Sequence, residues 1–141
     1  MTISTFFTDD HRACDAAWTE VERLVDAGDP DGPAAFHRFA AAMERHFRME
    51  EDVLFPAFEA ATGMSGGPTA VMRMEHEQMR GLLRQMASAA DADPEALLDQ
   101  GDTLLMLVQQ HNMKEEGMLY PMCDVRLGGH EDELLARCAE V

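Results

Sequence analysis

The chain has 141 residues, which is enough for one domain with its own hydrophobic core and without disulfide bonds. Acidic residues outnumber basic ones by 27 to 11, which argues against binding to nucleic acid or to an anionic membrane surface, since both need basic patches. The three cysteines form no Cys-x2-Cys pair, which favours a reducing compartment. The sequence also shows no secretory signal and no apolar run near the roughly 20 residues of a membrane span. We therefore expect a cytoplasmic location.

Four long segments rich in helix-forming residues lie between clusters of glycine and proline. Thr8 or Asp9 can cap the first of them. No segment alternates with period two, so we expect no strands. In chain order the sequence predicts four long helices and a short fifth one near residues 8–27, 33–62, 68–90, 94–127 and 130–139. The short connections favour an all-α fold, a single domain over residues 1–141 built as an up-down-up-down four-helix bundle.

Each long helix carries an apolar stripe whose members recur at steps of three and four residues, as on a face buried in a bundle. His and Glu interrupt these stripes, with apolar neighbours one turn before and after them. The stripes contain Phe7, His11, Cys14, Trp18, Val21 and Val25; Phe39, Met43, His46, Glu50, Val53 and Ala57; Met72, His76, Met79, Leu83, Met86 and Ala90; and Leu104, Val108, His111, Glu115, Met118 and Met122. The sequence therefore predicts four imidazoles and two carboxylates in the interior.

The two halves of the chain repeat one polar pattern at an offset of 65 residues. His-x3-Glu-Glu followed by Leu-Phe-Pro begins at His46, and His-x3-Glu-Glu followed by Leu-Tyr-Pro begins at His111. An acid lies three residues after each of these prolines. The same offset relates His11 to His76, and each of these follows an acidic residue. Such a doubled set in one register indicates a two-metal site on a pseudo-twofold scaffold.

A metal site explains why these charged groups lie on buried faces. An unpaired buried carboxylate costs several kcal/mol, and the stripes contain no Lys or Arg to pair with Glu50 and Glu115. Side chains four residues apart converge from one helix face. We therefore expect a metal site of nitrogen and oxygen donors, suited to iron, manganese or zinc, whose ligands are His11, His46, Glu50, His76, His111 and Glu115.

Simpler interpretations explain single residues but not the set. One His-x3-Glu is usually an exposed helix pair, and one histidine on an apolar face is usually a satisfied core residue. We interpret Cys14 as a buried thiol rather than a ligand, and we leave His37 and His130 outside the site. Glu51 and Glu116 point about 100° away from the ligand glutamates and are expected at the surface or in support of the ligands. Pro56 and Pro121 should each leave a kink beyond the site.

The chain resembles the hemerythrin-like family, also called the HHE cation-binding domain, from about residue 8 to 125. The resemblance is carried by Asp10-His11, His46-x3-Glu50-Glu51 with Leu54-Phe55-Pro56, Glu75-His76, and His111-x3-Glu115-Glu116. It implies two non-haem iron ions bridged by an oxo or hydroxo group, with iron favoured over manganese or zinc. It further implies that Glu50 and Glu115 bridge the ions and that the four histidines are terminal ligands.

One position departs from the family's oxygen carriers. These have a fifth histidine four residues before the one at position 76, where this chain has Met72. Counting donors around two octahedral ions then leaves about one open place on each ion. A more open centre suits reaction with a small oxidant at least as well as reversible carriage.

The leading functional hypothesis is a di-iron protein that binds or reacts with dioxygen, nitric oxide or hydrogen peroxide. Apolar walls around the site (Trp18, Phe39, Met43, Met79) would exclude water and admit only small molecules. The alternative is iron storage, iron delivery or redox sensing without turnover, and a third possibility is a structural zinc ion. The sequence leaves open enzyme or carrier, the redox partner, and monomer or homodimer.

Overall fold

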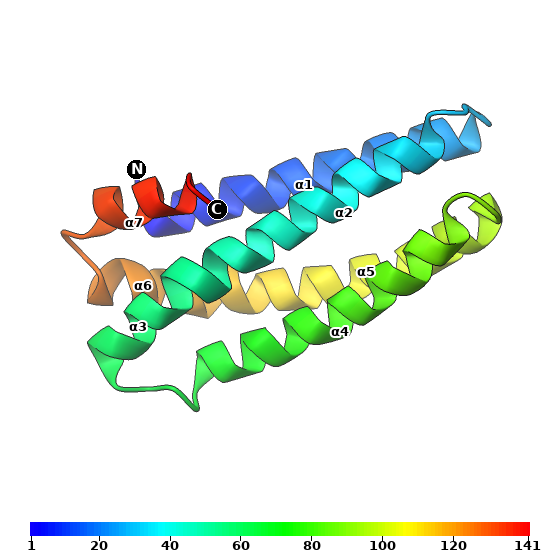
Figure 1. The fold of residues 1–141 in the computed structure, drawn as a ribbon. Coiled ribbons are helices and arrows are strands. Elements are labelled where there is room, and N and C mark those ends of the chain that lie inside the picture. The colour runs from blue at the N-terminus through cyan, green and yellow to red at the C-terminus, as the bar shows by residue number, and fades with distance from the viewer.

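The computed structural model describes residues 1–141 and contains helices and their connections but no strand, which confirms the predicted all-α class (Figure 1). Four long helical stretches lie side by side, and the second and fourth each contain a π-helical turn. In chain order the elements are α1 (Ile3–Asp26), α2 (Gly32–Met49), η1 (Glu50–Leu54), α3 (Phe55–Thr62), α4 (Pro68–Ala89), α5 (Pro94–Lys114), η2 (Glu115–Leu119), α6 (Tyr120–Arg126) and α7 (Glu131–Cys138). None of these helices is both long and apolar enough to cross a membrane.

The first helix begins five residues earlier than predicted. Its cap is Thr2, whose hydroxyl oxygen accepts a hydrogen bond from the Thr5 backbone N–H at 3.0 Å. The expected caps Thr8 and Asp9 therefore lie inside α1. The additional turn is stabilised because Ile3 is fully buried at the end of the bundle.

The acids that follow the two repeated motifs attach the starts of α1 and α4 to the bundle. Ser4 donates through both its backbone N–H and its hydroxyl to Asp124 of α6. At the equivalent place in the other half, the Thr69 hydroxyl donates to Glu59 of α3 at 2.6 Å. These bonds hold the two halves in matching registers.

The repeated prolines produce π turns that begin at the predicted ligand glutamates themselves, rather than a kink further along. The Phe55 N–H donates to the Glu50 carbonyl, and the Tyr120 N–H donates to the Glu115 carbonyl, each five residues back. A proline in an α-helix lacks an N–H and its ring clashes with the carbonyl four residues before it. A π turn, which spans one more residue than an α turn, places each proline at the start of a new α-helix.

The additional residue in each π turn shifts the buried face by one position. Along the fourth stripe, Met118 was expected in the core but is 51% exposed, and Leu119 and Cys123 are buried in place of Met118 and Met122. In the second stripe Phe58 is fully buried where Ala57 was expected. Beyond the glutamates the α-helical period therefore places Val53 correctly in the core but is wrong for Ala57, Met118 and Met122.

Two apolar clusters lie on either side of the polar residues. One contains Trp18 and Phe39 near the ends of α1 and α2 that are joined by a short loop. The other contains Phe7, Phe55 and Tyr120 at the opposite end of the bundle, where α7 packs on α1 and η1. The His and Glu side chains form a layer between these clusters, so the bundle shields them from water at both ends.

Candidate metal centre

The structure brings all six predicted ligand residues together in the interior. Their side chains come from α1, α2, η1, α4, α5 and η2, and each is less than 5% exposed. Two groups of possible metal-binding atoms form, each with all its atoms within 4.8 Å of one another. One group contains Glu50, His76, His111 and Glu115, and the other contains His11, His46 and Glu115.

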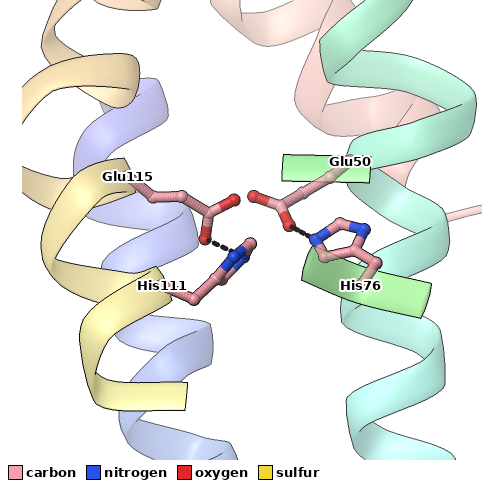
Figure 2. Close-up of side chains that lie close together, drawn as sticks. All are labelled: Glu50, His76, His111 and Glu115. Carbon is pink, nitrogen blue, oxygen red and sulfur yellow. Dashed lines mark ion pairs between the residues drawn. The ribbon is translucent and has the colours of Figure 1, made fainter. Parts of the chain in front are cut away.

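Each carboxylate faces one histidine from each half of the chain. Glu50 Oε1 lies 3.0 Å from His76 Nε2 and 3.4 Å from His46 Nε2. Glu115 Oε1 lies 3.2 Å from His111 Nε2 and 3.0 Å from His11 Nε2. Figure 2 shows the two glutamates pointing toward one another from opposite sides, with His76 and His111 beneath them. The two carboxylates are therefore placed where both can contribute oxygen atoms to a metal site.

Several atoms at the centre are buried without a hydrogen-bonding partner: Glu50 Oε1, Glu115 Oε2, His76 Nε2 and His111 Nε2. The close pair His76 Nε2 and Glu50 Oε1 is not aligned for a hydrogen bond, although 3.0 Å separates the two atoms. Leaving such atoms unpaired in the interior is costly. Imidazole nitrogen and carboxylate oxygen are also the donors that iron, manganese and zinc accept. The residues present therefore fit a metal cluster.

A second acid orients each histidine through its other ring nitrogen, because an Nδ1–H that donates to a carboxylate fixes the ring and leaves Nε2 facing the centre. The four Nδ1 atoms lie 2.6–2.9 Å from acidic side chains on neighbouring helices, in the pairs His11–Glu116, His46–Asp10, His76–Glu51 and His111–Glu75. The supporting position expected for Glu51 and Glu116 is therefore where the structure places them. The sequence marked Asp10 and Glu75 only as residues that precede a histidine.

Tyr120 is the residue at the centre that sequence reasoning missed. Its hydroxyl donates to Glu50 Oε2 at 2.7 Å or to Glu115 Oε1 at 2.9 Å, and it lies 3.1 Å from His11 Nε2. An α-helix would turn residue 120 about 140° away from residue 115, whereas the π turn returns it to the same face. The signal in the sequence was the replacement of phenylalanine by tyrosine in the second repeat, Leu-Tyr-Pro against Leu-Phe-Pro.

The electrostatics of the metal-free centre favour protons on the rings of His46 and His76. Burial alone would lower the pKa of His46, but the charge of Glu50 and the bond to Asp10 outweigh it and raise that pKa to about 10. For His76, burial is outweighed by the nearby carboxylates of Glu50 and Glu51, and its pKa rises to about 9. The carboxylates thus attract positive charge, which a metal ion supplies in place of these protons.

A small cavity lies beside the histidines toward the Trp18 cluster. Its volume is about 10 Å³, the lower limit for one water molecule. Met43 and Met79 line it, as predicted, whereas Trp18 and Phe39 belong to the apolar cluster behind it. The cavity is lined by His11, Cys14, Met43, His46, Phe47, Met79, Val108, His111 and Asn112.

Cys14 is buried, and His37 and His130 lie outside the site, as the sequence predicted. Desolvation raises the pKa of the Cys14 thiol to about 12, so it remains a neutral thiol at physiological pH. It belongs to neither group of possible metal-binding atoms. His37 and His130 are exposed and lie outside the site.

Comparison with protein families agrees with this geometry. The family described as "Hemerythrin HHE cation binding domain" matches residues 2–123, which contain every His, Glu and Tyr side chain of the centre. Comparison with curated proteins and with solved structures gives no match. The match covers most of the chain, and the structure contains a buried cluster of histidines and glutamates that can hold cations. The chain therefore belongs to the hemerythrin-like HHE cation-binding family.

Proposed function

We propose that the protein holds two non-haem iron ions and binds or reacts with a small ligand such as dioxygen, nitric oxide or hydrogen peroxide. The observation that carries the proposal is the convergence of four imidazoles and two carboxylates, several of them without hydrogen-bonding partners, in a buried layer. Glu50 and Glu115 would bridge the ions. His11 and His46 would hold one ion, and His76 and His111 the other.

The scaffold would be one domain, an up-down-up-down four-helix bundle with α7 added. Short connections between the long helices support that topology. Its apolar clusters exclude water from both ends of the centre, and the pairing of each Nδ1 with an acid keeps every ring in position. Bound iron would supply one-electron redox chemistry and Lewis acidity.

Tyr120 would hold a proton at the centre. Burial and the charges of Glu50 and Glu115 raise its pKa, so the phenol is neutral when the site contains no metal. Its hydroxyl lies within hydrogen-bonding distance of one oxygen of each of these glutamates. Tyr120 would therefore keep its proton between the two carboxylates and donate a hydrogen bond to one of them at a time.

The size of the cavity supports a small ligand rather than stored iron. A space of about 10 Å³ beside His11, His46 and His111 has no room for a mineral core or an organic substrate. This observation favours binding or reaction of a diatomic molecule or peroxide over the storage alternative.

The test is the metal content and optical spectrum of freshly purified protein, before and after dithionite and then after air. We expect about two iron ions per chain and charge-transfer bands of a bridged ferric pair, which dithionite bleaches. Rates of colour return in oxygen and in peroxide then separate reversible binding from turnover. Protein from iron-replete cells that contains no iron, and takes none up when reduced, would refute the proposal.

A further inference from the structure

The internal repeat makes it possible to compare the surroundings of the two proposed metal positions residue by residue. Every ligand and every supporting acid has its counterpart at an offset of 65 residues. The halves differ just outside this set, at the residues that hold Glu51 and Glu116. These two acids support His76 and His11 respectively.

Arg80 fixes Glu51 on the His76 side. Its guanidinium donates to both carboxylate oxygens of Glu51, at 2.8 and 2.9 Å, while only 15% of the Arg80 side chain is exposed. The same group donates to Glu44 at 2.9 and 3.1 Å and to Glu77 at 2.7 Å. A two-point bond between Arg and a carboxylate fixes orientation as well as charge.

The equivalent of Arg80 in the first half is Asp15, an acid. Glu116 consequently has no Arg or Lys bound to it and contacts only His11, and 36% of its side chain is exposed, against 18% for Glu51. Burial, and to a lesser extent the charge of Glu116, raises the pKa of Asp15. The support behind His11 therefore rests on a more exposed carboxylate, whereas Arg80 holds the support behind His76 at two points.

The packing around the His76 and His11 rings also differs between the two halves of the chain. His76 is stacked between Phe47 and Phe55, with ring centroids 4.3 and 5.7 Å away, and is fully buried. The counterpart of Phe47 is Asn112, a partly exposed amide that lines the small cavity next to His11. Besides the neighbouring histidine in each half, the His76 ring thus packs against two phenyl rings, whereas the His11 ring packs against Tyr120 alone.

We propose that the two metal positions have unequal affinities, and that Arg80 makes the position formed by His76 and His111 the tighter one. This inference rests on the proposed two-metal centre. The positive charge of Arg80 by itself would repel a nearby cation, but Glu44 and Glu77 bind the same guanidinium and neutralise it. Pre-organisation of Glu51 and His76 therefore decides the order, because a held ring loses less freedom when it binds a metal.

The test is a titration of metal-free protein with Co²⁺, followed by calorimetry and by the visible spectrum of the ion. We expect two binding steps that differ at least tenfold in affinity. Arg80→Gln should weaken the first step about 10–100-fold and leave the second within about twofold. Arg84→Gln is the matched control, because Arg84 lies one turn further along α4 and its side chain makes no hydrogen bond or ion pair. It should change neither step.

Two further variants assign the steps to positions. His11→Ala should keep the tighter step, and His76→Ala should lose it. Two equal steps in the unmodified protein, or an equal loss in both steps for Arg80→Gln, would overturn the inference while leaving a two-metal centre intact. Absence of any Co²⁺ binding would instead refute the proposed centre itself.

Discussion

Tyr120→Phe removes one hydroxyl from the centre and leaves the ring in place. A phenyl ring fits this environment, since Phe55 occupies the equivalent position in the other half and is equally buried. The substitution therefore separates the hydrogen bonds of Tyr120 from its packing. The effect of the substitution should depend on whether a bound metal ion also satisfies the carboxylate oxygens.

The size of the effect follows from the contacts of the hydroxyl. A phenol has one proton, so it donates to Glu50 or to Glu115 at any moment, at 2.7 or 2.9 Å. A hydrogen bond to a charged group contributes about 1.5–3 kcal/mol. We expect Tyr120→Phe to lower the unfolding free energy of the metal-free protein by about 2 kcal/mol, which moves the urea midpoint by about 1 M. With metal bound, cations satisfy the same oxygens and the loss should fall below about 1 kcal/mol.

The assay is urea unfolding followed by the fluorescence of Trp18, the single tryptophan, with and without bound metal. The metal-loaded protein is the internal control, because folding and packing are the same in both titrations. Equal stability of Tyr120→Phe and unmodified protein in the metal-free state would show that the hydroxyl carries no net hydrogen-bond energy. The same loss in both states would show that bound metal does not satisfy the carboxylate oxygens in place of the hydroxyl.

Three further outcomes test the centre and its scaffold. Glu50→Ala should lose most of the bound iron while circular dichroism keeps its helical signal, and full iron occupancy would contradict the bridging role. Gly101→Ala should destabilise the fold by about 1–3 kcal/mol in urea, because a Cβ there would lie 2.1 Å from a ring carbon of Trp18; unchanged stability would refute that close contact. In metal-free protein the pKa of His46 is raised from 6.5 to about 10, and that of His76 to about 9. The stability that these protonated rings add is therefore complete below pH 6.5 and is lost as the pH rises through 9 and 10. Urea midpoints measured across this range should fall accordingly, and a flat profile would contradict protonated rings.

Much of the candidate site could be predicted because its residues lie where an α-helical period applies. His46 and Glu50 are four residues apart with no proline between them, and the apolar residues around them mark the buried face. The same argument holds for His111 and Glu115. Beyond each glutamate the period changes, and predictions such as the burial of Met118 are wrong there.

The supporting residues were harder to predict because their partners are distant in sequence. His11 and Glu116 are joined across 105 residues, and Arg80 reaches Glu51 across 29. Such pairs depend on which helices are neighbours and on how far each is displaced along its axis. A single sequence shows that an acid is present but not which ring it supports.

The order of amino acids by itself determined the helices, the doubled histidines and glutamates, and their burial, because apolar spacing and missing counter-charges are local properties of the chain. Only the folded arrangement decided that Tyr120 enters the centre and that Arg80 locks one half of it. The physical reason is that a proline-induced π turn rotates everything after it by one position, and that ionic contacts between helices depend on their mutual register.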